Sequence, residues 1–233
     1  MEYLYETHMH TSESSACGQD SASAQVRAYK KRGYTGIIVT DHFIHRSLTH
    51  IPLPWKSRMK ILLHGYNIAL KEGKKCGLDV FLGWEFTDYD SGRDFLTYGL
   101  GLEFLLKHPN LYNIPIEQYS KIVREAGGYL AQAHPFRNSS YIQIKEPVSP
   151  ELIDGIEVYN AANSYEENKK AFDFAIEHNL PMQSGSDSHS VHVYRNNYSG
   201  ISLKNRAENI FDIIEAIKNN TGSLILSDDF KVI

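Results

Sequence analysis

The segment GIIVTDH, residues 36–42, joins a run of β-branched residues to two side chains that can bind metal. An uninterrupted apolar run of this length predicts a strand buried on both faces, as in a parallel sheet. Asp41 and His42 follow the predicted strand 36–40. They lie at the end of the strand where α/β folds place their active sites. The segment therefore predicts both the class of fold and the edge of the sheet that carries the chemistry.

Further apolar runs bounded by polar residues or glycine predict strands over 3–6, 79–85, 95–100, 128–133, 155–158, 181–184 and 199–202. Amphipathic stretches predict helices over 21–32, 57–76, 116–126, 164–178 and 207–219. This alternation predicts an α/β architecture with a mainly parallel sheet. About seven βα units favour a barrel over a small open sheet. Segments 43–54 and 135–150 lack periodicity, and we expect them to form loops over one end of the domain.

The bulk composition restricts the class of protein. The chain has 233 residues, 42% of them hydrophobic, which suits a single domain over residues 1–233 with a substantial core. A net charge of −4 gives no support for a stable nucleic-acid complex. No apolar run approaches the roughly 18 residues of a membrane span, so no membrane partner is expected. The start, MEYLYETHMH, lacks the features of a signal peptide, which favours a cytoplasmic protein.

Two cysteines occur, Cys17 and Cys76, far apart in the sequence. This spacing excludes a Cys-x-x-Cys zinc site and argues against a disulfide framework. The composition makes no prediction about the oligomeric state.

Side chains that can bind metal recur at or near the ends of most predicted strands: His8, His10, Asp41, His42, Glu85, Asp94, His134, Glu157, Asp187 and His189. Most of them follow the carboxyl end of a strand, so residues far apart in sequence can converge in one cleft. Imidazole and carboxylate together suit zinc, iron or manganese. A carboxylate can also bridge two ions about 3.5–4 Å apart.

The pair His8-x-His10 has a geometric consequence. Side chains repeat every two residues along a strand, so both imidazoles can reach one ion, and Asp187-x-His189 has the same spacing. Each element alone also has a simpler interpretation. A lone His-x-His is more often incidental, and Asp41 could form a local turn. Because residues that can bind metal occur at the ends of several predicted strands, the pattern favours a metal site.

Five segments carry a family resemblance: ETHMHTS (6–12), IIVTDHF (37–43), GWEF (83–86), QAHPFR (132–137) and SGSDSH (184–189). In this order and spacing they resemble the PHP (polymerase and histidinol phosphatase) superfamily, over nearly the whole chain. The resemblance implies a distorted (β/α)7 TIM-like barrel with two or three divalent metal ions, zinc, manganese or iron. It also implies a metal-dependent hydrolase of phosphate esters, either phosphomonoesters or phosphodiesters.

The resemblance further implies a set of metal ligands: His8, His10, His42, Glu85, Asp94, His134, Asp187 and His189. In that scheme Glu85 bridges a first ion to a second one bound by His134. The side chains of His42 and His189 then face a third position.

Two positions depart from the family pattern. Ser15 stands where relatives commonly have aspartate or histidine, so the third position loses its usual ligand. Glu13, Cys17 or Asp20 are the nearby residues that could compensate. The second departure is Asp94, which stands where relatives often have a histidine that serves the second ion.

Phosphoester hydrolysis through a metal-activated water needs further groups. His42 or His189 would protonate the leaving oxygen as catalytic residues. Arg137 and Arg195 are candidates to bind phosphate oxygens of a small phosphorylated substrate, including a nucleotide-like one.

Two other functions stay open. An amidohydrolase-type metal hydrolase acting on C–N bonds shares the His-x-His start, but it usually has a strand-end lysine that has no counterpart in this sequence. The other is a non-catalytic, metal-stabilised binding module.

Overall fold

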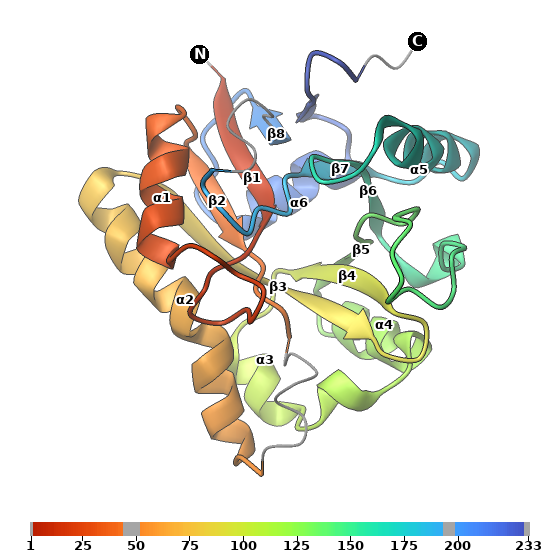
Figure 1. Cartoon of the computed structure of the whole chain (residues 1–233), viewed down its shortest axis with the longest axis horizontal. Helices are drawn as coiled ribbons and strands as arrows, with labels where there is room; N and C mark the ends of the chain where they lie inside the picture. Colours follow the sequence, from red (N-terminus) through yellow and green to blue (C-terminus); the bar gives the residue numbers. More distant parts are fainter. Residues whose placement is uncertain (1, 44–51, 193–198, 231–233) are drawn as a thin grey trace.

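The computed structural model describes residues 2–43, 52–192 and 199–230. In chain order the strands are β1 (Tyr3–Met9), β2 (Gly36–Val39), β3 (Asp79–Asp88), β4 (Arg93–Tyr98), β5 (Tyr129–Gln132), β6 (Gly155–Asn160), β7 (Met182–Gly185), β8 (Gly200–Leu203) and β9 (Ser223–Ile225). The α-helices are α1 (Ala22–Lys31), α2 (Trp55–Cys76), α3 (Leu102–Lys107), α4 (Ile116–Glu125), α5 (Tyr165–Glu177) and α6 (Ile210–Lys218). Figure 1 shows the helices arranged around the outside of the sheet.

The sheet curls into a nearly closed barrel. The strand order within the described residues is β7-β6-β5-β4-β3-β2-β1-β8-β9. Beyond the end of β7 the chain returns to β1, where the Asp187 N–H donates to the His8 carbonyl (2.8 Å) and the His10 N–H to the Ser188 carbonyl (2.9 Å). Met9 and Ser188 form an isolated parallel bridge at this seam. The TIM-like barrel prediction is therefore confirmed, with its seam closed beside the His-x-His segment.

The prediction of a mainly parallel sheet is wrong. Four pairs are parallel (β1–β2, β2–β3, β5–β6 and β6–β7), whereas β3–β4, β4–β5, β1–β8 and β8–β9 are antiparallel. The β3–β4 reversal has a local cause: a tight turn joins the two strands, with Gly92 at φ +73° and its N–H bonded to the Asp88 carbonyl at 2.7 Å. A hairpin reverses the chain without a crossover helix, so β3 and β4 run antiparallel.

Most predicted elements are confirmed with shifted ends. The predicted strand 3–6 continues to Met9, which places His8 within the strand. Helix α3 and strand β9 were not predicted, because six and three residues are too short for a periodic pattern. Segment 135–150 is a loop as far as a short 3-10 turn that begins at Pro150, as predicted. Most of the predicted loop 43–54, residues 44–51, lies outside the described residues.

Strand alternation aims Glu85 into the barrel. On either side of it, Trp84 and Phe86 pack into an apolar cluster with Tyr119 of α4. The Phe86 and Tyr119 rings stack at 3.7 Å, and the Trp84 indole N–H donates to the Tyr119 hydroxyl at 2.6 Å. Because neighbouring side chains point to opposite faces, packing of Trp84 and Phe86 against α4 fixes Glu85 on the opposite face.

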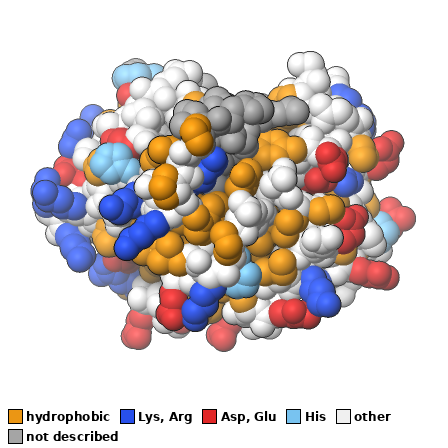
Figure 2. All heavy atoms as spheres, turned by 90° about the horizontal axis from the view of Figure 1, so that it is seen from below, with side chains coloured by type: hydrophobic (Ala, Val, Ile, Leu, Met, Phe, Trp, Pro, Cys, Tyr) orange, Lys and Arg blue, Asp and Glu red, His pale blue; other side chains and the backbone are white. Residues whose placement is uncertain are grey.

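The outer surface mixes apolar and charged side chains. On the face shown in Figure 2, apolar side chains gather over the centre and charged ones lie toward the edge. Among the described helices, none is both long enough and apolar enough to cross a membrane.

The buried carboxylate of Glu6, in β1, accepts hydrogen bonds from segments that are far apart in the sequence. Its Oε1 accepts from the backbone N–H groups of His8 (2.9 Å) and Ser186 (2.9 Å). Its Oε2 accepts from the hydroxyls of Tyr29 (3.0 Å) and Ser199 (3.2 Å). Burial raises the pKa of Glu6, although the hydrogen bonds from His8, Ser186 and Tyr29 oppose the rise. The carboxylate thus satisfies buried donors from four separate segments.

We expect Glu6→Ala to lower the free energy of unfolding by about 3 kcal/mol, because several buried donors lose their acceptor. Urea unfolding in the presence of a chelator measures this loss without a contribution from bound metal. Glu103→Ala, at an exposed position on α3, is the matched control and should change stability by less than about 0.5 kcal/mol. Equal stability of the two variants would show that the Glu6 network contributes nothing.

Candidate metal centre

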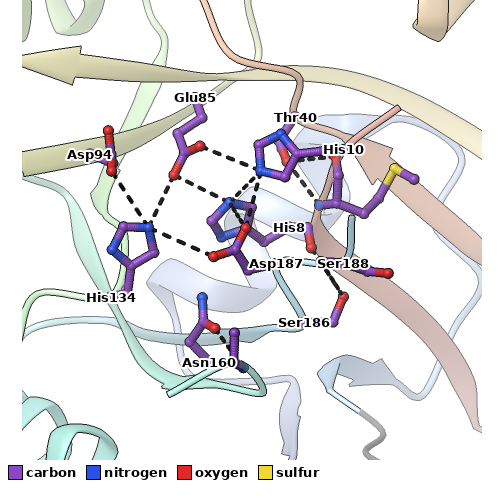
Figure 3. A network of polar contacts seen from close by, with 12 residues as sticks. His8, His10, Thr40, Glu85, Asp94, His134, Asn160, Ser186, Asp187 and Ser188 are labelled. Atoms are coloured by element: carbon purple, nitrogen blue, oxygen red, sulfur yellow. Dashed lines mark hydrogen bonds and ion pairs between the residues drawn. The ribbon is translucent and has the colours of Figure 1, made fainter. Parts of the chain in front are cut away.

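Six buried side chains, carried within or just after five strands, point toward one another inside the barrel: His8, His10, Glu85, Asp94, His134 and Asp187. Figure 3 shows them converging around a shared space. His8 lies in β1, Glu85 in β3 and Asp94 in β4, while His134 and Asp187 follow β5 and β7. The structure therefore brings together residues separated by up to 179 positions, as the strand-end pattern predicted.

Glu85 contacts four imidazoles. Its Oε1 lies 3.3 Å from His8 Nε2 and 3.2 Å from His134 Nε2. Its Oε2 lies 3.4 Å from His10 Nε2 and 3.0 Å from His42 Nδ1. Each oxygen faces a different pair of nitrogens, which is the arrangement that a bridging carboxylate requires.

Asp187 closes the other side of the cluster. Its Oδ1 lies 3.5 Å from His8 Nε2 and 3.2 Å from His10 Nε2, and its Oδ2 receives Arg137 Nη1 at 2.7 Å. Asp187 has φ +54° and His134 has φ +30°, in the left-handed region that non-glycine residues rarely adopt. Such strain is commonly found at functional sites, where the surrounding structure holds it.

For His8 and His10, a hydrogen-bond partner outside the cluster fixes which ring nitrogen points inward. His8 Nδ1 lies 3.0 Å from Glu157 Oε1, so in the neutral imidazole it carries the proton and the Nε2 lone pair faces the cluster. His10 Nδ1 lies 3.2 Å from the Ser15 hydroxyl, whose own proton goes to Asp41 Oδ1 at 2.7 Å. The two inward Nε2 atoms are 3.2 Å apart. Lone pairs that face one another and two carboxylates are the donor set of a divalent cation.

The neighbouring carboxylates and imidazoles also shift the pKa values of His8 and His10. Burial opposes the charged form of His8, but Glu157, Asp187 and Glu85 outweigh it and hold the pKa of His8 well above its usual value. Burial lowers the pKa of His10 to about 3. Adjacent imidazoles thus have opposite shifts, because the carboxylates favour the charged form of His8, whereas burial together with His42 and His189 disfavours that of His10.

Within the described residues, four groups of three side chains place their ligand atoms within 4.8 Å of one another: His8–His10–Glu85, His8–His134–Asp187, Glu85–Asp94–His134 and His10–His42–His189. His8, His10, Glu85 and His134 each belong to two groups. Shared ligands are typical of centres that hold more than one ion, so the cluster is consistent with a multi-metal site.

Asp94 lies beside His134, among the other predicted metal ligands. Its Oδ2 is 3.8 Å from His134 Nε2, and its Oδ1 accepts from the Thr87 hydroxyl at 2.6 Å. Burial, with a contribution from the Glu85 charge, raises the pKa of Asp94 to about 6. The aspartate thus shares a group with His134 and Glu85 in place of the histidine that the family pattern has.

Ser15 and Asp41 lie behind the imidazoles. Asp41 accepts from the Thr11 N–H (2.7 Å) and from the Ser15 hydroxyl (2.7 Å), and burial raises its pKa to about 6. The Ser15 oxygen in turn accepts the His42 backbone N–H at 3.1 Å. The sequence showed Ser15 only as a missing ligand, whereas its contacts orient His10 and the start of the loop after β2.

A pocket of about 440 Å³ opens over the cluster. The sequence did not single out three aromatic residues that line it, Phe43, Tyr89 and Tyr141. Arg137 also lines the pocket, but besides Asp187 it already donates to Asn163 Oδ1 (2.9 Å) and Asn160 Oδ1 (3.0 Å). The other predicted phosphate ligand, Arg195, lies outside the described residues.

Cys17, one of the three residues that could compensate for the ligand missing at Ser15, lines the same pocket. Burial would raise the pKa of this thiol, but hydrogen bonds and charge from His189 and His42 lower it to about 7. Its only sequence signal is its place seven residues after His10, in the loop that follows β1.

No protein-family model matches the chain, and no curated protein matches it. Solved structures do match it. A two-domain protein from Bacteroides vulgatus, containing a predicted PHP-like metal-dependent phosphoesterase, superposes with a TM-score of 0.74 at 18% identity. The alignment covers 97% of this chain but 65% of that protein, so the chain spans less than two thirds of its length.

Three further structures share the fold. A protein from Bifidobacterium adolescentis, assigned by prediction as a metal-dependent phosphoesterase, has a TM-score of 0.57 at 16% identity and covers 92% of this chain and 95% of its own. PsfC from Pseudomonas syringae has a TM-score of 0.64 at 16% identity, with 98% and 93% coverage. An amidohydrolase from Chromobacterium violaceum, with bound sulfate and no metal, has a TM-score of 0.55 at 14% identity, with 80% and 87% coverage.

Identities of 14–18% establish a common fold and not a common activity. At this level the comparison confirms the barrel fold that the sequence motifs implied. Two of these neighbours are described as predicted metal-dependent phosphoesterases, one of them PHP-like, and the chain shares their distorted TIM-like barrel.

Proposed function

We propose that the protein is a metal-dependent hydrolase of phosphate esters. The observation that carries the proposal is the contact of one buried carboxylate, Glu85, with the four imidazoles of His8, His10, His42 and His134. Divalent ions in this centre would supply a water of lowered pKa and would neutralise charge on the phosphoryl oxygens. The proposed ligands are His8, His10, Glu85 and Asp187 for one ion, and Glu85, Asp94 and His134 for another.

The pocket supports a small substrate. Its volume of about 440 Å³ suits a small molecule and not a folded nucleic acid. Phe43, Tyr89 and Tyr141 would contact an apolar or flat organic group, while the phosphate would lie toward the buried cluster. A nucleotide-like ester meets both requirements. We assign Arg137 to the phosphate end, where its ion pair with Asp187 also holds that carboxylate in place.

Two half-buried imidazoles line the pocket, those of His42 and His189. We place them against the leaving oxygen of the ester. In this position they could carry the proton that the leaving group takes up, or they could hold a further ion. The contacts of Cys17, described below, favour the second role.

The amidohydrolase alternative has one specific observation in its favour, which is the structural likeness to the Chromobacterium violaceum amidohydrolase. The described lining of the pocket contains no lysine, a residue that the strand ends of that family usually carry. Phosphoester hydrolysis therefore remains the better-supported function, and a non-catalytic metal-stabilised module is the third candidate.

We expect the purified protein to hydrolyse small phosphomonoesters or phosphodiesters when Mn²⁺ or Zn²⁺ is added, and to leave amides intact. The assay compares phosphate or alcohol release with amide cleavage, before and after treatment with a chelator. Cleavage of amides alone would establish the amidohydrolase alternative. Full metal content without turnover of either class would favour a binding module.

His10→Ala should reduce both metal content and hydrolysis, the latter by about 100-fold or more, because His10 belongs to two ligand groups. Elemental analysis measures the metal, and circular dichroism verifies that the fold is kept. The matched control is His178→Ala, at an exposed position at the end of α5. Metal content equal to that of the control would place the centre elsewhere.

Glu157→Gln tests the outer layer of the centre. The carboxylate accepts from His8 Nδ1 (3.0 Å) and from the His134 backbone N–H (3.0 Å). An amide at this position weakens the hold on the His8 tautomer, so we expect metal affinity to fall by about 10- to 100-fold. Competition with a chromogenic chelator measures the affinity, and an unchanged value would show that Glu157 does not orient the ligand.

A further inference from the structure

Cys17 lies against the two imidazoles of the pocket. Its Sγ is 3.1 Å from His189 Nε2, and His42 lines the same pocket. The thiol is free and exposed at the pocket wall, whereas the other cysteine, Cys76, lies at the end of α2 with its Sγ 3.8 Å from the Gly73 carbonyl. Cys17 therefore faces the candidate centre and not a disulfide partner.

The imidazole of His189 presents a lone pair to this sulfur. Its Nδ1 lies 2.8 Å from the Asp187 carbonyl, which can only accept, so Nδ1 carries the proton. The ligand atoms of His10, His42 and His189 lie within 4.8 Å of one another. Nitrogen and sulfur ligands at the usual zinc distances lie about 3.6 Å apart in a tetrahedral site, which is about 0.5 Å more than the 3.1 Å between Cys17 Sγ and His189 Nε2.

The other candidates in this loop have different partners. Glu13 Oε2 accepts from the Ala22 N–H at the start of α1 (2.8 Å). Asp20 Oδ2 accepts from the Ser190 hydroxyl and the Val191 N–H, both at 2.9 Å. Ser15 lies behind His10, as described above. Of the acidic and thiol side chains in segment 11–20, Cys17 is the one whose contacts lead to the imidazoles.

We propose that the Cys17 thiolate is a ligand of a further metal ion on the pocket side of the centre, held together with His42 and His189 near His10. The proposal rests on the metal-centre part of the proposed function. Sulfur and imidazole donors select zinc or iron over magnesium and manganese, so this position differs in preference from the carboxylate-rich inner positions. It also assigns His42 and His189 to metal binding in place of proton transfer.

Cobalt substitution tests the proposal without an activity measurement. The Co²⁺-loaded protein should show a thiolate-to-cobalt charge-transfer band in the near ultraviolet. Cys17→Ser should lose this band, and Cys76→Ser, the matched control, should keep it. The same samples are analysed for total metal, and we expect Cys17→Ser to retain the inner ions while losing the pocket-side equivalent.

Thiol protection gives a second measurement. Zinc should slow alkylation of Cys17 by iodoacetamide about tenfold or more, as quantified by peptide mass spectrometry, and should leave Cys76 unchanged. A band that persists in Cys17→Ser, or an alkylation rate unaffected by zinc, would overturn the assignment. Wild-type protein with inner ions but no band would overturn the Cys17 role alone, whereas wild-type protein without any bound metal would overturn the metal centre as well.

Discussion

The burial of Glu85 is the constraint on which the rest of the site depends. This carboxylate is 1% exposed, and an unpaired charge at such a position would cost several kcal/mol. Burial alone would raise its pKa, but His42 and His8 outweigh burial and hold the pKa well below its usual value. The charge of Glu85 therefore persists only because imidazoles from other strands surround it. A cation among the same groups would meet this need more completely than a shared proton.

The residues around Glu85 fix one another's orientation, from the carboxylate outward. Strand alternation and the apolar packing of Trp84 and Phe86 set the direction of the carboxylate. The inner imidazoles meet it with their Nε2 atoms, because Glu157 and Ser15 occupy the Nδ1 atoms of His8 and His10. Ser15 is held in turn by Asp41. Such outer partners commonly decide how well a metal site binds, since they fix tautomer and ring orientation before the ion arrives.

The sequence predicts the parts of this protein that follow a repeating rule. Buried strands have recognisable apolar runs, and their ends carried most of the residues that converge in the structure. The β3–β4 hairpin was missed because its turn, with Gly92 at a positive φ, is a local feature within an otherwise alternating pattern. The paired state of Arg137 and the place of Ser15 behind His10 depend on contacts with Asp187 and Asp41, which lie in other segments of the chain. No spacing along the chain encodes such contacts.

The proposed assignment of Cys17 gives the centre two chemically different sides. The inner side is rich in carboxylates, from Glu85, Asp94 and Asp187, and it is buried. The pocket side has imidazole and sulfur donors and is partly exposed. Carboxylates tolerate manganese as well as zinc, whereas a thiolate favours the softer ions, so the two sides would differ in metal preference. An exposed thiolate is also the group most open to oxidation, and its loss would remove the pocket-side ion first. The departure from the family pattern at Ser15 would then mark a change of ligand type and not the loss of a metal position.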